Sequence, residues 1–379
     1  MNHIYLDNSA TTQVCREAAD KALELMTQQY GNPSSLHALG FGAEQELSAA
    51  RQAIADALQA KPEEIFFTSG GTEANNLAIF GAVEAKKRFG KHIVTTQIEH
   101  PSVLGCMAQL EKQGYSVTYL EPDTQGKISA QQVADAIGSE TILVSMMLVN
   151  NEVGTILPVE AAAKAISRKK APALLHVDAV QGFGKLSIKP KRMRIDLLSV
   201  SSHKIHGPKG VGALYLADGV RILPRLFGGG QEKGLRPGTE ALPLIGAFGA
   251  AVRALPRPEE GLAAMQDLAD YCREKLEGIP GVVVNSPADS LPYLIHFSTH
   301  SVRSETMLHF LSAKGIFVSS GSACSKAKAS HVLTAMKLPR AGIHTALRVS
   351  FSRWNQRSDI DQLIDALQEG METLAKGTL

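Results

Sequence analysis

The sequence is poor in cysteine and in aromatic residues, and it has no long apolar run. Of its 379 residues only 4 are cysteines and 1 is tryptophan, and aromatic residues make up 5%. The cysteines are Cys15, Cys106, Cys272 and Cys324. None belongs to a C-x-x-C pair, which argues against a disulfide scaffold and a structural zinc site and favours a reducing compartment. No apolar stretch approaches the ~18 residues of a membrane span, and residues 1–12 are too polar for a signal peptide. We therefore expect a cytoplasmic protein without a bound metal.

The sequence also has no large excess of positive or negative charge. The 39 Lys and Arg residues nearly balance the 37 Asp and Glu residues, for a net charge of +2. Nucleic-acid binders usually carry a concentrated basic stripe. The densest basic segment, Lys189 to Arg194, contains no aromatic residue, and we predict that it is a solvated loop. Neither a nucleic acid nor an anionic membrane is expected as a partner.

Short apolar runs alternate with helical patterns through most of the chain, which predicts an α/β fold. Such an alternation is typical of a mainly parallel sheet with helices on both faces. Helices are expected over Ala43–Ala60, from about Thr72, from Pro101, over Ser129–Ile137 and after Pro158. The runs that predict buried strands are Ile65–Thr68, His92–Thr96, Ser116–Leu120, Ile142–Val149, Leu174–Val177, Asp196–Val200 and Val211–Leu216.

The pattern changes after Leu242, where a long helical stretch, interrupted around Pro256 and Pro258, continues to about Glu277 and shorter strands and helices follow. A chain of this length is about 2.5 times a typical domain of ~150 residues. We predict a large domain over residues 13–255. A smaller α+β domain is predicted to comprise residues 1–12 and 256–379.

Two polar residues at the ends of predicted strands suggest a carbonyl cofactor. Lys204 ends the segment Ser201-Ser202-His203-Lys204, which follows the predicted strand Asp196–Val200. Asp178 ends the preceding predicted strand, which begins at Leu174. Ligands of open α/β sheets bind beyond the carboxyl ends of the strands. A lysine there can form a Schiff base, and a buried carboxylate needs a partner such as a protonated pyridine nitrogen. Pyridoxal phosphate requires both groups. Alternatively, Lys204 lies in an ordinary surface loop and Asp178 caps the next helix.

Other strand ends carry groups that complete such a site. The turn Thr68-Ser69-Gly70-Gly71-Thr72-Glu73 opens a helix, and helix N-termini bind phosphate. Ser201 and His203 are candidate further phosphate donors, and Gln181 is a candidate donor to the ring oxygen. His100 is placed to stack on a pyridine ring, although a lone histidine is more often structural. Asn150 and Asn151 end another strand; either one can instead stabilise a turn.

Cys324 lies in a small polar loop, Ser319-Ser320-Gly321-Ser322-Ala323-Cys324-Ser325. Structural cysteines usually lie in apolar packing, as Cys106 and Cys272 are expected to do. Lys326 and Lys328 nearby favour a thiolate. Cys324 is therefore the candidate nucleophile, and the alternative is an accidental surface thiol.

Taken in order, these residues resemble the cysteine desulfurases, pyridoxal-phosphate enzymes of fold type I in the class V aminotransferase group. The resemblance extends from Tyr5 to Ser350 and includes the segment Gly228 to Thr239. It implies that Lys204 is the Schiff-base lysine and that Asp178 pairs with the pyridine nitrogen. It also implies a homodimer in which Thr239 of the partner subunit reaches the phosphate. The remaining implied roles are ring contacts by His100 and Gln181, phosphate contacts by Gly71, Thr72, Ser201 and His203, and binding of the substrate carboxylate by Asn151 and Arg348.

The resemblance implies removal of sulfur from L-cysteine to give L-alanine and a persulfide on Cys324. A protein acceptor, either an iron–sulfur scaffold or a tRNA-thiolation relay, is expected to take the sulfur. Two other enzyme classes remain open: a selenocysteine lyase, and another class V activity such as transamination, which has no need of Cys324. A non-catalytic relay protein is disfavoured because Lys204, Asp178 and His100 are all present.

Overall fold

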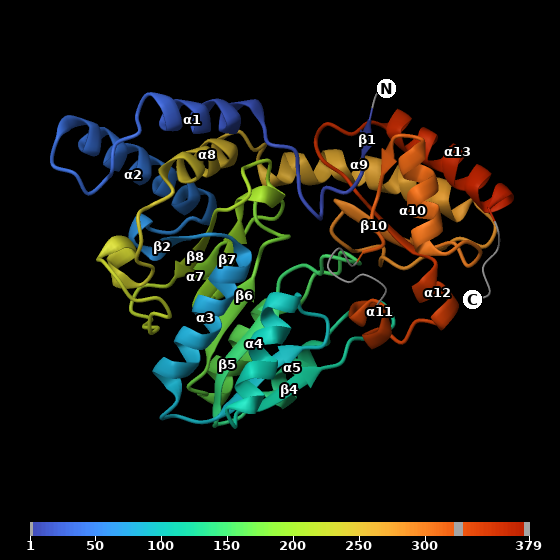
Figure 1. Ribbon diagram of the computed structural model, residues 1–379. Helices are drawn as coiled ribbons and strands as arrows, with labels where there is room; N and C mark the ends of the chain where they lie inside the picture. Colours follow the sequence, from blue (N-terminus) through green and yellow to red (C-terminus); the bar gives the residue numbers. More distant parts are fainter. Residues whose placement is uncertain (1–2, 322–328, 375–379) are drawn as a thin grey trace.

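The computed structural model describes residues 3–321 and 329–374, and a seven-stranded sheet forms its centre (Figure 1). The strand order is β2-β8-β7-β6-β5-β3-β4. Strand β8 runs antiparallel to both neighbours, and the other adjacent pairs are parallel. The strands are β2 (Ile65–Thr68), β3 (His92–Thr96), β4 (Ser116–Leu120), β5 (Thr141–Met147), β6 (Leu174–Asp178), β7 (Leu197–Ser201) and β8 (Gly212–Leu216). This arrangement confirms the predicted α/β class and mainly parallel sheet.

Helices cover both faces of this sheet because neighbouring strand residues point to opposite sides. Phe66 packs in one hydrophobic cluster with helices α3 (Gly71–Lys86) and α4 (Pro101–Lys112). Phe67, the next residue, packs in another cluster with helices on the opposite face. Those helices include α1 (Arg16–Thr27), α2 (Ala38–Leu58), α5 (Ala130–Ala136), α6 (Val159–Lys169) and α8 (Leu242–Arg253). Strands that are buried on both faces explain the continuous apolar runs in the sequence.

A separate hydrophobic cluster joins the N-terminal residues to the C-terminal third of the chain. It contains Leu6, Phe297 and Leu367, all fully buried. Around it lie an antiparallel sheet of order β12-β10-β9 and a parallel pair, β1 with β11. The strands are β1 (Ile4–Tyr5), β9 (Val283–Val284), β10 (Leu294–Ser298), β11 (Ile316–Phe317) and β12 (Ala346–Ser350), and the helices are α9 (Pro258–Glu277), α10 (Ser304–Ala313), α11 (His331–Ala335), α12 (Arg340–His344) and α13 (Arg357–Thr373). The domain limits given above remain a prediction.

The helical stretch from Leu242 is interrupted as predicted, because it consists of two helices, α8 and α9, and Pro258 begins the second. One local feature differs from the expectations. The basic segment is not a loop, because Pro190 begins the short helix α7 (Pro190–Met193) and is itself buried. Proline suits a first helical position, where its missing N–H is not needed. Within the described residues, no helix is long and apolar enough to cross a membrane.

Candidate active site

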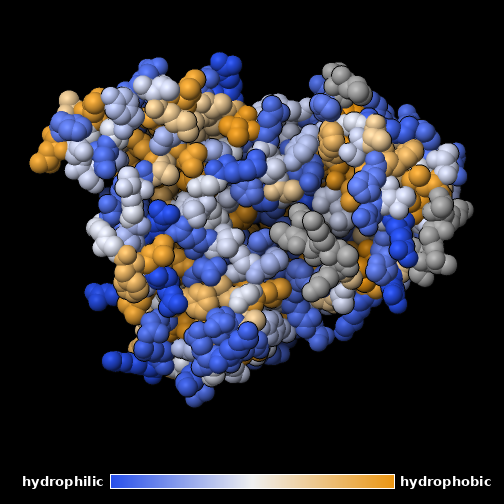
Figure 2. Space-filling view, viewed as in Figure 1, coloured by the Kyte–Doolittle hydropathy of each residue, from blue (hydrophilic) through white to orange (hydrophobic). Residues whose placement is uncertain are grey.

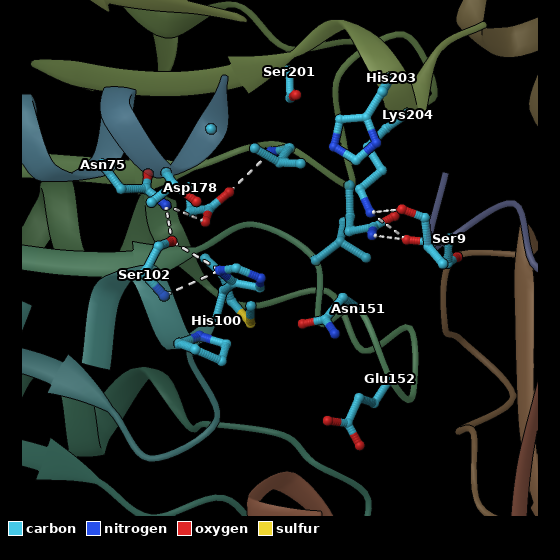
Figure 3. A pocket seen from close by; sticks show the side chains of 18 of the residues that line it. Ser9, Asn75, His100, Ser102, Asn151, Glu152, Asp178, Ser201, His203 and Lys204 are labelled. Atoms are coloured by element: carbon cyan, nitrogen blue, oxygen red, sulfur yellow. Dashed lines mark hydrogen bonds between the residues drawn. The ribbon is translucent and has the colours of Figure 1, made fainter. Parts of the chain in front are cut away.

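A cavity of about 280 Å³ opens where strands β5, β6 and β7 end. Parallel strands end at one edge, so polar residues that are distant in sequence meet there. Figure 3 shows Lys204 and Asp178 extending into this space from opposite sides. The lining includes nearly all the predicted residues: Gly71, Thr72, His100, Asn151, Asp178, Gln181, Ser201, His203, Lys204 and Arg348.

Lys204 lies in a short 3₁₀ turn directly after β7, and its amine is held by two backbone carbonyls. Nζ donates to Ser9 O at 2.5 Å and to Ala10 O at 2.7 Å. Burial, together with the positive charges of Arg348 and Lys185, lowers the pKa of Lys204 to about 7, although Asp7 and Asp178 oppose the shift. An amine with this pKa is largely neutral near physiological pH and is therefore able to act as a nucleophile or a base.

Asp178 ends β6 and is linked to His100 through two residues that the sequence analysis had not assigned. Asn75 Nδ2 donates to Asp178 Oδ2 at 2.7 Å and to Ser102 Oγ at 2.9 Å. Ser102 Oγ lies 2.8 Å from His100 Nδ1. Asp178 Oδ1 accepts from the backbone N–H of Val180 at 3.0 Å, so the carboxylate also stabilises the following turn. Asn75 and Ser102 are 27 residues apart in sequence and lie on the neighbouring helices α3 and α4.

His100 has both a structural role and a place in the cavity wall. It is the N-cap of α4, where Nδ1 accepts from the backbone N–H of Ser102 at 3.2 Å. That bond leaves the proton of the neutral ring on Nε2. Burial lowers the pKa of His100, with Lys204 and His331 adding to the effect and Asp178 opposing it. The predicted ring-stacking role remains a prediction.

A phosphate-sized cradle lies at the N-terminus of α3. Gly70 has φ = 149°, which few other residues adopt. A Cβ on Gly71 would lie 2.8 Å from Val180 Cγ2, so this position has no room for a side chain. The buried Ser201 Oγ has no hydrogen-bond partner among the described residues. Burial lowers the pKa of His203 to about 4, with Lys204 and Lys209 contributing. A neutral imidazole and a free hydroxyl, beside free helix N–H groups, form a donor set suited to phosphate.

Gln181 and Thr239 were predicted to contact the cofactor, and both contacts remain predictions. Gln181 Nε2 donates to Ser9 O at 2.9 Å, and its Oε1 accepts from Lys185. Thr239 is exposed and is not among the residues that line the cavity. Its proposed contact therefore requires a partner subunit, as the resemblance implied.

Arg348 approaches the cavity from β12 and is 2% exposed. Its Nη1 donates to Asn151 O at 2.7 Å, and Nη2 lies 2.8 Å from Asp7 Oδ1. Its Nε is buried without a hydrogen-bond partner in the described chain. Asp7, Glu152 and His331 had no predicted role, although the last two also line the cavity. These three residues come close to the site through tertiary contacts, which the spacing of residues in the sequence does not predict.

Cys324, the predicted nucleophile, lies outside the described residues. Gly321, three positions earlier, lines the cavity. The other cysteines are buried: Cys15, Cys106 and Cys272. Burial was predicted for Cys106 and Cys272.

Comparison with known proteins identifies the family. The class V aminotransferase model matches residues 4–363. Cysteine desulfurase IscS of Methanosarcina thermophila is 42% identical over 98% of this chain and 92% of its own length, and cysteine desulfurase 2 of Trichormus variabilis is 41% identical over 99% and 94%. A solved NifS-like protein superposes with a TM-score of 0.93 at 36% identity, covering 98% of this chain and all of that one. The chain belongs to the cysteine desulfurase family of class V aminotransferases. A further solved structure, SspA in complex with cysteine, gives a TM-score of 0.83 at 36% identity, over 93% of this chain and all of SspA.

The cysteine desulfurases are pyridoxal-phosphate enzymes of fold type I, and this member has a donor set that fits the cofactor. Lys204 would supply the amine for the aldehyde, and the buried Asp178 would face the ring nitrogen. The unpartnered Ser201 Oγ and the cradle at Gly71 suit the phosphate. When bound, the cofactor withdraws electrons from the α-carbon of an amino acid.

Proposed function

We propose that this cysteine desulfurase transfers the sulfur of L-cysteine to Cys324 and releases L-alanine. The observation that carries the proposal is the joint placement of Lys204, Asp178 and Arg348 around one cavity that Gly321 also lines. The first two residues suit the cofactor, and the third suits an amino-acid carboxylate. Gly321 lies three residues before Cys324 in the sequence, and a segment of three residues spans at most ~10 Å.

The residues around the cavity have different roles in the proposed reaction. Arg348 and Asn151 hold the substrate carboxylate and orient the α-carbon toward Lys204. The neutral Lys204 amine removes the α-proton, while Asp178 maintains the positive charge on the ring nitrogen. The Cys324 thiolate attacks the substrate sulfur, the carbon–sulfur bond breaks, and protons return to the carbon skeleton. Atoms balance, since L-cysteine and the enzyme thiol give L-alanine and the enzyme persulfide.

Peptide mass analysis after brief exposure to L-cysteine, without reductant, tests this proposal. We expect one added sulfur on Cys324 and none on the buried Cys15, Cys106 and Cys272, which serve as internal controls. The Cys324→Ala variant should keep the cofactor and lose persulfide formation. Unmodified Cys324 in cofactor-loaded protein would contradict the proposal; alanine formation from selenocysteine alone would then indicate a selenocysteine lyase.

The proposed enzyme is a homodimer. Large apolar side chains are exposed on α1, on α2 and on the segment between them, and Figure 2 shows them gathered over this end of the molecule. Leu36 and Phe41 are 105% and 63% exposed. Patches of this kind mark interfaces, and the exposed Thr239 requires a second subunit for its proposed phosphate contact. Light scattering should give the dimer mass, and Leu36→Glu with Phe41→Glu should shift it toward the monomer. A monomeric parent protein would contradict the proposal.

The proposed acceptor is a cytoplasmic protein, either an iron–sulfur scaffold or a tRNA-thiolation relay. A persulfide is a chemically labile carrier that a thiol of another protein can attack, and a reducing compartment keeps such thiols free. Incubation of radiolabelled persulfide enzyme with each purified acceptor type, followed by non-reducing electrophoresis, distinguishes the two. Label that remains on the enzyme with both would contradict this part of the proposal.

A further inference from the structure

Lys185 is a buried lysine that the reaction as described above does not use. It is 7% exposed, and no carboxylate of the described residues lies within ion-pair distance of its Nζ. Its hydrogen bond goes to a neutral oxygen, Gln181 Oε1, at 3.3 Å. The Tyr293 ring lies 5.2 Å from Nζ. An ammonium without a counter-charge is costly to bury, so its position requires a compensating role.

Lys185 shares a second cavity with Lys204. This cavity has a volume of about 30 Å³ and is lined by both lysines, together with Asn8 and Thr12. Lys204 is the one described residue that lines both this cavity and the active-site cavity. It therefore forms the wall between them, with Lys185 on the side away from the substrate.

A continuous hydrogen-bond path joins the two lysines. Lys185 Nζ donates to Gln181 Oε1, and Gln181 Nε2 donates to Ser9 O at 2.9 Å. Lys204 Nζ donates to the same Ser9 oxygen at 2.5 Å. The Lys185 ammonium and the Ser9 carbonyl therefore fix the Gln181 amide together, since the ammonium only donates and the carbonyl only accepts. Removal of the lysine leaves Gln181 Oε1 without this donor.

Charges of both signs lie around the two lysines. Arg348 and Lys185 lower the pKa of Lys204, while Asp7 and Asp178 oppose them, with burial as the largest cause. Burial and Arg348 lower the pKa of Lys185 to about 8. The groups that face this pair are Arg348, Arg353, His100, His203, His206, Asp7 and Asp178.

We propose that Lys185 is a positioning residue for Lys204. Its ammonium orients the Gln181 amide and, as an unpaired positive charge behind the cavity, disfavours a second proton on the Lys204 nitrogen. This role extends the proposed function, because it keeps Lys204 ready to bind the cofactor and to accept the α-proton. It makes no contact with the substrate.

The test is a pH titration of the visible absorbance of cofactor-loaded enzyme without substrate. Lys185→Met removes the charge and keeps most of the stem, so the protonation midpoint at Lys204 should rise by about half a unit or more. Lys185→Arg keeps the charge and should leave the midpoint within about 0.2 units of the parent value. Lys169→Met is the matched control, because Lys169 also donates to a neutral oxygen, Ile137 O at 2.6 Å, and lines neither cavity.

The outcomes separate positioning from a packing role. A raised midpoint in Lys185→Met with parent-like values in Lys185→Arg and Lys169→Met supports the proposal. An unchanged midpoint in Lys185→Met overturns it, whatever happens to turnover. If Lys185→Met does not fold, Lys185→Gln supplies the neutral variant and must show the same rise. The titration needs no substrate. A negative result for the Lys185 proposal is therefore distinguishable from a failure of persulfide formation at Cys324.

Discussion

Arg348 and Asp7 form a partly buried ion pair between the last strand and the N-terminal segment, with 2.8 Å between Nη2 and Oδ1. The pair connects residues 341 positions apart and fixes the guanidinium at the cavity wall. Nη1 is held by Asn151 O, and Nε has no partner among the described residues. Asp7 therefore orients Arg348 before a substrate arrives, and Nε remains available to a carboxylate.

Arg348→Lys should raise the KM for L-cysteine about tenfold or more, with a smaller effect on kcat. Lysine keeps the charge but cannot present two parallel N–H groups while also holding Asp7. A tenfold change corresponds to about 1.4 kcal/mol. Steady-state alanine formation measures both constants. Arg357→Lys is the control, because Arg357 pairs with Asp267 at an exposed site. An unchanged KM in Arg348→Lys would show that the carboxylate binds elsewhere.

Lys204→Ala should abolish the change in cofactor absorbance that L-cysteine produces. The variant lacks the amine that is expected to hold the aldehyde and to take the α-proton. Lys209→Ala is the control, since Lys209 is five residues further along and exposed. Rapid-scanning spectroscopy after mixing with L-cysteine provides the measurement. Turnover retained in Lys204→Ala would refute its assignment as the cofactor lysine.

The sequence predicted the strands that position the site more accurately than it predicted the contacts within the site. Strands β2, β3 and β4 begin and end at the predicted residues, because short runs of strand-forming residues are bounded there by polar and turn-forming residues. Strands β1 and β11 were missed, since two-residue strands carry no periodic pattern.

Site residues were predictable where they end a strand. Asp178 and Lys204 follow apolar runs directly, and parallel strands bring such ends together. Asn75, Ser102 and Asp7 were not assigned, because their roles arise from packing between distant segments. Lys185 was overlooked for the same reason, as sequence gives no sign that a lysine is buried without a counter-charge.

Arg51→Met should lower the stability of the protein by about 3–5 kcal/mol. Arg51 makes a two-pronged pair with Glu232, at 2.7 and 2.8 Å, and the Glu232 carboxylate also accepts from Phe67 N. Removing the arginine leaves a carboxylate that is 8% exposed without its counter-charge. The urea midpoint should fall accordingly. Arg16→Met breaks an exposed pair with Asp20 and should lower the midpoint far less; equal losses in both variants would contradict the argument.

Glu99→Gln should become more stabilising, relative to the parent protein, as the pH rises from 5 to 8. Glu99 is fully buried, its Oε1 accepts from Thr96 Oγ1 and Met147 N, and its Oε2 has no partner in the described chain. Burial raises the pKa of this carboxyl to about 8, with Asp178 adding to the effect. The folded protein therefore keeps a proton that the unfolded chain releases above pH ~4.5.

The sign of this effect follows from proton linkage. Because the unfolded state binds fewer protons over this range, the contribution of Glu99 to stability is complete below pH ~4.5 and is lost as the pH rises through about 8, by at most ~1.4 kcal/mol per unit. Glutamine has no such proton to release. Thermal melting of both proteins at several pH values isolates the residue, since the other groups titrate alike in each. Parallel stability curves would mean that Glu99 is already ionised in the folded protein.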